Sequence, residues 1–398
     1  MKIPSSLVVV VSSLLLANDV QSAITLPLKP IAKKPGSTIK QSTKTNYKTT
    51  ITVPVKDWIK HAADLQWYTE VEVGTPSQKF NVIFDTGSFE MFIANKNCTD
   101  CSKSRLFDSD RSSSFSDQPG NRDGFGYGTG VDSTPLPPGG EGVSGRYVTD
   151  RVGISGQYVN EQQFLLCDDY PEFMNDVPFD GVMGIGQRGI SSLPSGQPWY
   201  WALYATGQLE GPEFSMYYPA GKEDGAEMTL GGTNPARYTG DIHRVDLIGD
   251  GNFVVRQPSL AINGKNFSPA AGRTTILDSG TAYFATDDQM VTAIYKSISP
   301  QIKKLNQEAW GVACDIIESL AVSFTFTFGK GADIFNATMP KEAFNLGPYE
   351  GKPGICQTVF SSLSLGSKTF LIGAPLLKQY YTVWDGLNLK MGFAELRN

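Results

Sequence analysis

Two short motifs limit what this chain can fold into more than any other feature of it. They read Phe84-Asp85-Thr86-Gly87-Ser88 and Leu277-Asp278-Ser279-Gly280-Thr281. Each motif ends an apolar run with Asp, a hydroxyl residue, Gly and a second hydroxyl residue. A single such tripeptide is common in turns. Two copies, each at the end of an apolar strand, predict a duplicated fold that brings two carboxylates together.

A second pair of phrases supports the duplication. Residues 179–186 and 370–377 each place Gly after paired hydrophobic residues, and each follows its Asp at nearly the same offset. Coincidence is the alternative in a chain with 41 Gly, but a repeat of two units is the more economical interpretation. The 398 residues, 40% of them hydrophobic, suffice for two lobes with a large core. Many short β-branched and aromatic runs predict a strand-rich fold.

The N-terminal residues 1–23 are predicted to be a secretory signal peptide. Lys2 provides a positive end, residues 7–17 form an apolar stretch, and residues 20–23 end on small side chains. A membrane anchor is the alternative, but the apolar stretch is too short to span a bilayer. We therefore expect a protein that is secreted, or delivered to a vacuolar or lysosome-like compartment. Asn97, Asn266 and Asn336 are then glycosylation acceptors.

A basic segment follows the signal peptide. Residues 24–60 hold eight Lys and one acidic residue, Asp57, whereas the rest of the chain is acidic. We interpret residues 24–55 as a propeptide that docks electrostatically on an acidic body. Acid would protonate the carboxylates of the body and loosen this docking. A disordered tail without an inhibitory role is the alternative. A body this acidic is a poor partner for nucleic acid.

The chain has five cysteines. Cys98 and Cys101 are spaced like a redox or zinc pair, but no second such motif and no ligand-spaced His accompany them. A small disulfide loop is therefore favoured over a metal site. Cys314 and Cys356 can form a second bridge, which leaves Cys167 as an odd, buried thiol. The oxidising compartment that a signal peptide implies favours both bridges.

The chemistry open to the chain is narrow because it has only two His residues, His61 and His243. The sequence also lacks the Gly-x-Ser-x-Gly, His-Glu-x-x-His and phosphate-loop motifs. Acid–base catalysis therefore falls to carboxylates. If Asp85 and Asp278 lie within hydrogen-bond distance, they cannot both ionise cheaply and instead share one proton.

Such a pair can hydrolyse a peptide bond. The ionised Asp takes a proton from water and the protonated Asp donates one to the carbonyl oxygen, so no covalent intermediate is needed. The neighbouring residues suit this chemistry: glycines allow tight turns, inner hydroxyls can bond the opposite loop, and outer hydroxyls can bond the carboxylates. In that order they are Gly87 and Gly280, Thr86 and Ser279, and Ser88 and Thr281. Glycoside hydrolases also use two carboxylates but need no matching loops, which makes them the weaker interpretation.

On these motifs the chain resembles the pepsin family of aspartic proteases, from about residue 68 to 393. Residues 68–76 resemble the first strand and its Gly-Thr-Pro turn, Tyr127-Gly128-Thr129 the flap that closes over substrate, and residues 371–393 the end of the second lobe. The resemblance implies an all-β, bilobal double β-barrel with pseudo-twofold symmetry and a few short helices. It places the N-terminal lobe with its flap at residues 56–240 and the C-terminal lobe at 241–398.

The resemblance also implies a function. Asp85 and Asp278 would be the catalytic pair of an endopeptidase that works best in acid, as a monomer without cofactor, metal or membrane partner. Its partners would be a protein or peptide substrate and its own propeptide. An apolar pocket for the residue before the cut would be lined by Ile83, Tyr127, Phe173, Phe179 and Val182. This lining predicts a preference for large hydrophobic residues, although core packing is the alternative for the last two.

Three features depart from the family pattern. Phe92 stands where the family usually has Trp, so Tyr127 needs another hydrogen-bond partner or a looser flap. Ala282 replaces a hydroxyl residue that can bond the substrate backbone. Residues 131–142 form a Pro- and Gly-rich insertion beside the flap, which either shapes access or is a harmless surface loop. The alternative to an endopeptidase is an inactive relative that keeps the cleft and binds peptide or protein.

Overall fold

The computed structural model describes most of the chain after the leader. The described residues are 50–60, 63–98, 101, 105–129, 136, 141–170, 172–175, 177–188, 197–219, 221–249, 251–366 and 368–397. The predicted signal peptide, most of the predicted propeptide and most of the insertion at residues 131–142 therefore lie outside the described residues. None of the helices in the described part of the chain is long and apolar enough to cross a membrane.

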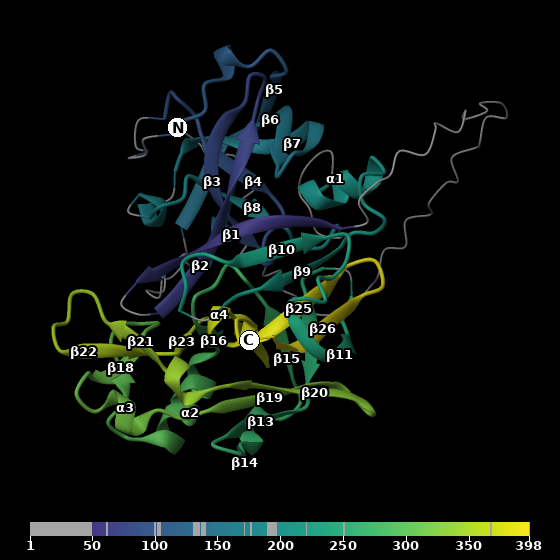
Figure 1. The fold of residues 1–398 in the computed structure, drawn as a ribbon. Helices are drawn as coiled ribbons and strands as arrows, with labels where there is room; N and C mark the ends of the chain where they lie inside the picture. The colour runs from purple at the N-terminus through teal and green to yellow at the C-terminus, as the bar shows by residue number, and fades with distance from the viewer. Residues whose placement is uncertain are drawn as a thin grey trace, which may run out of the picture.

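The molecule is mostly β-structure in two lobes, as the resemblance implied (Figure 1). The first lobe lies above and the second below, and a band of strands passes between them. One sheet of the described residues runs through the first lobe and this band. Its order is β11 (Tyr238–Asp246), β26 (Lys390–Leu396), β25 (Tyr380–Asp385), β9 (Glu213–Tyr217), β10 (Ala226–Leu230), β1 (Ile51–Lys60), β2 (Ala63–Val73), β3 (Gln78–Asp85), β8 (Gly181–Gly184), β4 (Met91–Ala94), β7 (Gln157–Asp169), β6 (Glu141–Ile154) and β5 (Ser116–Tyr127).

The second lobe is built from three smaller sheets and most of the short helices. The first sheet is β12 (Val254–Gln257), β15 (Arg273–Leu277), β24 (Thr369–Ile372), β16 (Phe284–Thr286) and β23 (Phe360–Ser362). The second is β14 (Lys265–Asn266), β13 (Ser259–Ile262), β19 (Phe324–Lys330) and β20 (Asp333–Met339), and the third is β17 (Lys303–Lys304), β18 (Trp310–Ala313), β22 (Ile355–Thr358) and β21 (Asn345–Pro348). The helices are α1 (Trp199–Ala205), α2 (Asp288–Ile298), α3 (Ile317–Leu320) and α4 (Ala374–Leu377), the first of them in the upper lobe.

The two halves repeat one strand arrangement. In the first lobe β3 pairs in parallel with β8, which pairs antiparallel with β4. In the second lobe β15 pairs in parallel with β24, which pairs antiparallel with β16. Each Asp motif thus leaves the end of a strand beside its own Gly-containing phrase. The similar spacing of the phrases in the sequence reflects this repeated pairing. The pairing places both Asp residues at equivalent strand ends.

The strands between the lobes run through both predicted domain boundaries. Strand β1 continues across residue 55 and buries alternate side chains, among them Val53 and Val55. It pairs with β10 over its first half and with β2 over its second half. Strand β11 continues across residue 240. The first residues of β1 are therefore part of the sheet that joins the lobes, and the boundaries at 55 and 240 remain predictions.

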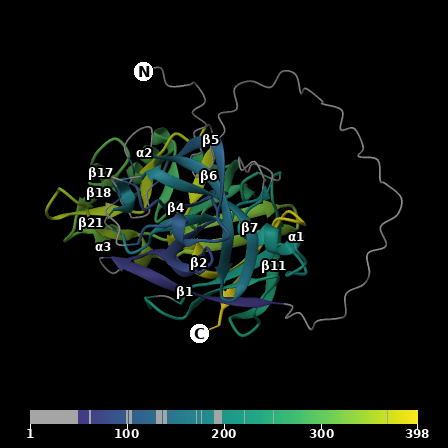
Figure 2. The same ribbon diagram turned by 90° about the horizontal axis from the view of Figure 1, so that it is seen from above.

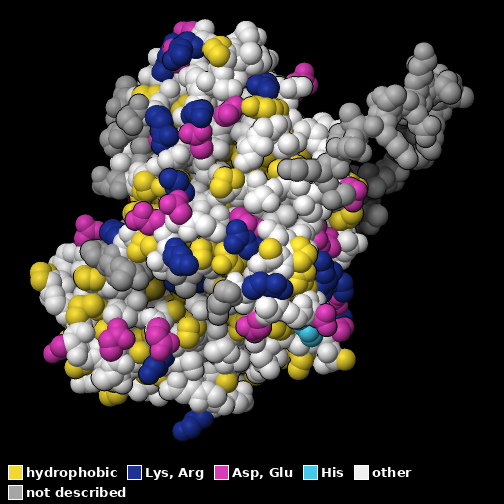
Figure 3. All heavy atoms as spheres, in the orientation of Figure 1, with side chains coloured by type: hydrophobic (Ala, Val, Ile, Leu, Met, Phe, Trp, Pro, Cys, Tyr) yellow, Lys and Arg dark blue, Asp and Glu magenta, His cyan; other side chains and the backbone are white. Residues whose placement is uncertain are grey.

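The surface in view mixes charges of both signs. Figure 3 shows acidic and basic side chains interspersed over both lobes, with hydrophobic side chains scattered between them. Among the described residues, Ile334 and Leu387 are the large hydrophobic side chains that are exposed. Scattered apolar side chains of this kind are ordinary on a protein surface.

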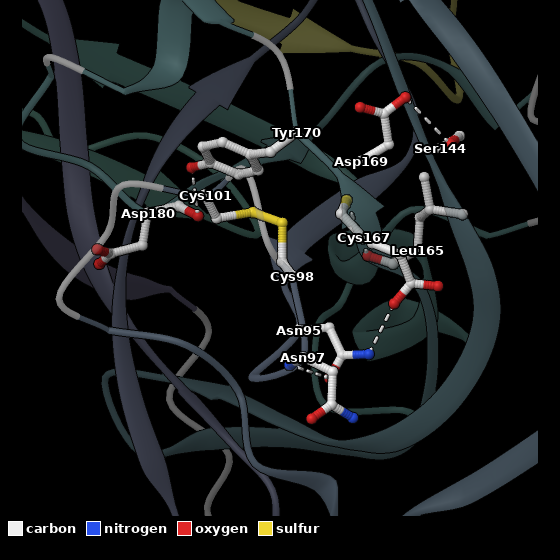
Figure 4. Close-up of a disulfide and its surroundings, with 11 residues drawn as sticks. Asn95, Asn97, Cys98, Cys101, Ser144, Leu165, Cys167, Asp169, Tyr170 and Asp180 are labelled. Atoms are coloured by element: carbon white, nitrogen blue, oxygen red, sulfur yellow. Dashed lines mark hydrogen bonds between the residues drawn. A yellow bond between two sulfur atoms is a disulfide. The ribbon is translucent and has the colours of Figure 1, made fainter.

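Both predicted disulfides are confirmed. Cys98 and Cys101 are bridged in the loop that follows β4 (Figure 4), and Cys314 and Cys356 are bridged in the second lobe. Cys167, on β7, is a free and buried thiol, as expected. Burial and the nearby charges of Asp168 and Asp169 raise its pKa well above the ordinary value, which disfavours the reactive thiolate.

Candidate active site

The two Asp motifs meet where the lobes meet. The carboxyl groups of Asp85 and Asp278 lie beside one another on either side of Gly280, and the two residues are 2% and 0% exposed. The glycines beside them leave the room that this requires. A methyl group on Gly87 would lie 2.7 Å from the Asp278 carboxylate, and one on Gly280 would overlap the Asp85 carboxylate. Only Gly fits at these two positions, because any side chain would separate the pair.

Reciprocal hydrogen bonds of the inner hydroxyls tie the two loops together. The Thr86 N–H donates to Ser279 Oγ at 3.1 Å, and the Ser279 N–H donates to Thr86 Oγ1 at 2.9 Å. The same hydroxyls donate onward to backbone carbonyls, Thr86 Oγ1 to Leu277 at 3.3 Å and Ser279 Oγ to Phe84 at 2.8 Å. All four groups are buried, so losing any partner would leave an unsatisfied polar atom. This network holds the two Asp residues in register.

Each carboxylate also accepts a bond from its own loop. The Gly87 N–H donates to Asp85 Oδ1, and the Gly280 N–H donates to Asp278 Oδ1, both at 2.8 Å. Asp278 Oδ2 accepts a further bond from Thr281 Oγ1 at 2.8 Å. The two carboxylates therefore have matching backbone donors, and Asp278 has a well-defined hydroxyl donor as well.

The pKa of Asp85 is raised well above its ordinary value. Burial away from water is the largest cause, and the negative charge of Asp278 adds to it. The nearby Ser88 hydroxyl and the hydrogen bond from the Gly87 N–H act in the opposite direction but do not cancel the rise. Asp85 therefore keeps a proton at a pH where an exposed Asp would have lost it. One proton shared by two contacting carboxyl groups is what this arrangement supports.

The flap covers this pair. Strands β5 and β6 form the hairpin, which lies in front when the molecule is seen from above (Figure 2). Tyr127 ends β5 and is buried, Gly128 follows it, and Thr129 Oγ1 lies 2.9 Å from Thr281 Oγ1 of the second motif. The predicted flap residues thus contact the predicted catalytic loops directly.

Because residue 92 is Phe and not Trp, no indole N–H from this position can bond the Tyr127 hydroxyl, and the nearby polar group is the Ser88 hydroxyl. The Phe92 ring packs against Tyr127, with ring centroids 5.9 Å apart, and also against Phe125 and Tyr170. Burial and the charges of Asp85 and Glu90 raise the pKa of Tyr127 well above its ordinary value, and the nearby Ser88 hydroxyl offsets only part of this rise. Tyr127 therefore stays protonated beside the carboxyl pair.

The predicted pocket walls lie beneath the flap. Ile83, Phe179 and Val182 are buried in one apolar cluster with Tyr127, and Ile83 is the β-sheet partner of Val182. The Phe173 side chain lies outside the described residues. With the flap in this position, the three walls pack as core residues, and their role as a pocket remains a prediction.

Two buried polar residues near the site belong to neither Asp motif. Gln66, on β2, donates from Nε2 to the Gly280 carbonyl at 2.7 Å, across 214 residues of sequence. Glu90 follows the first motif, is fully buried, and acts electrostatically on Tyr127. Sequence reasoning missed both of them. An acidic residue inside an apolar run was the one available signal, and it pointed to Glu90 alone.

The remaining predicted positions lie away from the carboxyl pair. Asn97, Asn266 and Asn336 are exposed, which suits glycosylation acceptors. His243 is half-buried and packs against Phe335 at 5.6 Å. His61 lies outside the described residues.

Comparison with known proteins agrees with this geometry. The sequence matches the eukaryotic aspartyl protease family over residues 66–396. It is similar to pepsin-2B of Gadus morhua, with 28% identity over 346 residues that cover 85% of this chain and 99% of the relative. It is also similar to pepsin A of Canis lupus familiaris, with 26% identity over 350 residues (86% and 84%). Cathepsin D of Chionodraco hamatus is 27% identical over 354 residues (86% and 84%). The chain therefore belongs to the eukaryotic aspartyl protease family.

Proposed function

We propose that this chain is an aspartic endopeptidase in which Asp85 and Asp278 activate a water molecule at acidic pH. The observation that carries the proposal is the contact of two buried carboxyl groups, one of which holds a proton well above its ordinary pKa. Two such groups provide an acid and a base in one place. The family to which the chain belongs supports peptide bonds as the substrate.

The hydrogen bonds support an assignment of the two roles. Asp278 accepts bonds from the Gly280 N–H and the Thr281 hydroxyl, which favour its charged form, so it acts as the base. Asp85 retains the proton and acts as the acid. Asp278 takes a proton from water, the water oxygen bonds to the peptide carbonyl carbon, and Asp85 protonates the carbonyl oxygen. The resulting diol collapses as the C–N bond breaks and the amine leaves with a proton returned by the pair.

The surroundings of the flap suggest the specificity. Ile83, Phe179, Val182 and Tyr127 form an apolar surface beside the first motif. A large hydrophobic side chain of the substrate would bury more area there than a small or polar one. A preference for such residues is therefore part of the proposal.

The proposal includes a secreted, proteolytically activated life cycle. Residues 1–23 would be removed as a signal peptide, and residues 24–55 would dock as a basic propeptide until acid releases them. The activating cut would fall between residues 50 and 63. Two disulfides fit an oxidising destination, outside the cell or in a vacuolar or lysosome-like compartment. The enzyme would act on proteins as a monomer.

Hydrolysis of a denatured protein at acidic pH, with and without a transition-state-like peptide inhibitor, tests the proposal. Asp85→Asn and Asp278→Asn should each reduce the rate by at least about 100-fold, since each removes a proton-transfer group. Asp246→Asn is the matched control, because it removes a carboxylate that pairs with Lys330 on the outside of the second lobe. Full activity in either active-site variant would refute the proposal.

The same assay separates the alternatives. An inactive relative would bind the peptide inhibitor without hydrolysing any protein. A glycoside hydrolase would release sugar from a polysaccharide and leave protein intact. N-terminal sequencing of the secreted product after brief acid exposure would locate the activating cut, and an intact residue 24 at the N-terminus would contradict the propeptide.

A further inference from the structure

A hydrogen-bonded chain connects the flap to one of the two carboxylates. Thr129 Oγ1, on the flap of the first lobe, lies 2.9 Å from Thr281 Oγ1, and Thr281 Oγ1 donates to Asp278 Oδ2 at 2.8 Å. Thr129 and Thr281 are 4% and 0% exposed, so water does not compete for these bonds. The contact spans 152 residues of sequence and joins the two lobes across the top of the pair.

The direction of the chain follows from counting protons. A hydroxyl group has one proton to donate and two lone pairs that accept. Thr281 gives its proton to Asp278 Oδ2, so it must be the acceptor in its bond with Thr129. The order is therefore Thr129 O–H to Thr281 O–H to Asp278. In a buried site, consecutive bonds pointing the same way polarise and strengthen one another.

We propose that Thr129 is a positioning residue that acts through Thr281, so that closing the flap strengthens the hydrogen bond that holds negative charge on Asp278. This inference rests on the proposed function. It gives the flap a role beyond covering the substrate. A lifted flap would take the Thr129 hydroxyl away from Thr281, whereas the lowered flap of this structure holds negative charge on Asp278 before substrate enters.

The sign of the effect can be worked out. A hydrogen bond to the charged form of a carboxyl group lowers its pKa, so losing the Thr129 bond should raise the lower of the two apparent pKa values of the pair. Asp85 is the titratable group that faces Asp278, Tyr127 on the flap interacts with Asp85, and Glu90 and Cys167 interact with Tyr127. A substitution at Thr129 changes none of them.

The test compares Thr129→Val, which keeps the shape but loses the hydroxyl, with Thr129→Ser, which keeps the hydroxyl. Each variant is made in the full chain and activated in acid, and kcat/KM is measured against pH on a peptide substrate. Since the relayed bond adds tens of per cent to a charge-assisted hydrogen bond, the acid limb should move up by about 0.3 pH unit in Thr129→Val. It should return in Thr129→Ser. A purely structural flap contact would raise KM equally at every pH.

A control and a double-mutant cycle sharpen the result. Thr325→Val removes a hydroxyl bond of the same length, 2.9 Å to Thr338, in the second lobe, and should leave the limb unmoved. Thr281→Val should move the limb further than Thr129→Val, and adding Thr129→Val to it should add nothing. An unmoved limb in Thr129→Val, or a full extra shift in the double variant, would overturn the inference.

The two proposals fail in distinguishable ways. A wild-type chain that hydrolyses no protein refutes the proposed function. The effect of Thr129 on Asp278 can still be measured, because carbon NMR of carboxyl-labelled Asp follows the ionisation of Asp278 without any catalysis. An upward shift of the lower apparent pKa in Thr129→Val supports the proposed action of Thr129 through Thr281, and an unchanged titration refutes it.

Discussion

Burial of the Asp85 carboxyl group makes a specific prediction about stability. We consider a chain that carries Asp278→Asn, which on the proposed mechanism cannot digest itself, and compare it with one that carries Asp85→Asn as well. Asp85 is buried, and burial is the largest cause of its raised pKa, so the effect persists without the Asp278 charge. Asn has the same shape and can still accept the bond from the Gly87 N–H.

The sign and magnitude follow from proton linkage. The ordinary pKa of Asp is 3.8, and the folded value lies well above it. Between the two values the folded chain binds more protons than the unfolded chain, so the free energy of unfolding falls as the pH rises. The fall is about 1.4 kcal/mol for each pH unit inside this window. Asn cannot ionise, so the double variant should gain about 1.4 kcal/mol on the single variant for each pH unit inside this window.

Urea unfolding of both variants from pH 4 to pH 7, at constant ionic strength, measures this difference. The two stability curves should start close together in acid and separate steadily as the pH rises. Asp246→Asn in the same background should instead differ from it by a nearly constant amount, because the hydrogen bond with Lys390 lowers the pKa of Asp246 below its ordinary 3.8 and its contribution is lost only below this pH range. Curves that run parallel across this range would show that the Asp85 carboxylate is ionised in the folded protein without penalty.

Two further predictions concern the bonds that hold the fold and the site. Replacing both cysteines of the Cys314–Cys356 bridge by Ser should lower the free energy of unfolding by about 4 kcal/mol. The same change at Cys98–Cys101 should lower it by about 2 kcal/mol, because that bridge closes a shorter loop. Equal losses in urea unfolding would contradict this chain-entropy argument. Ser279→Ala should cost about 1–3 kcal/mol by the same measurement, since it leaves the buried Thr86 N–H without its acceptor, and an unchanged midpoint would show that the cross-lobe bond is dispensable.

Much of the fold could be predicted because it depends on local patterns. Apolar runs that end in Gly or Asp form strands that pair in parallel, Val82 to Asp85 with β8 and Thr274 to Leu277 with β24. The repeated spacing of these runs predicted two equivalent halves, and the family match supports that result. The two disulfides were also predicted, because five cysteines with one close pair leave few plausible pairings.

The contacts around the site could not be predicted in the same way. Gln66 reaches the Gly280 carbonyl, and Thr129 reaches Thr281, across long stretches of sequence. Neither residue belongs to a pattern that distinguishes it from other strand or turn residues. Such contacts depend on how two lobes are oriented, which side-chain periodicity within one strand does not encode. Phe92 could be noted as unusual, but the place of Ser88 beside Tyr127 required the structure.

The sequence by itself determined which groups are present: two Asp residues at strand ends, a glycine in each motif that lets them approach, and a hydroxyl residue on either side of each glycine. The tertiary structure alone decided how strongly the Asp85 carboxyl group holds a proton and what the flap touches. The reason is that a carboxyl group loses its proton according to its distance from water and from other charges. Those distances exist only once the two lobes have closed around Asp85 and Asp278.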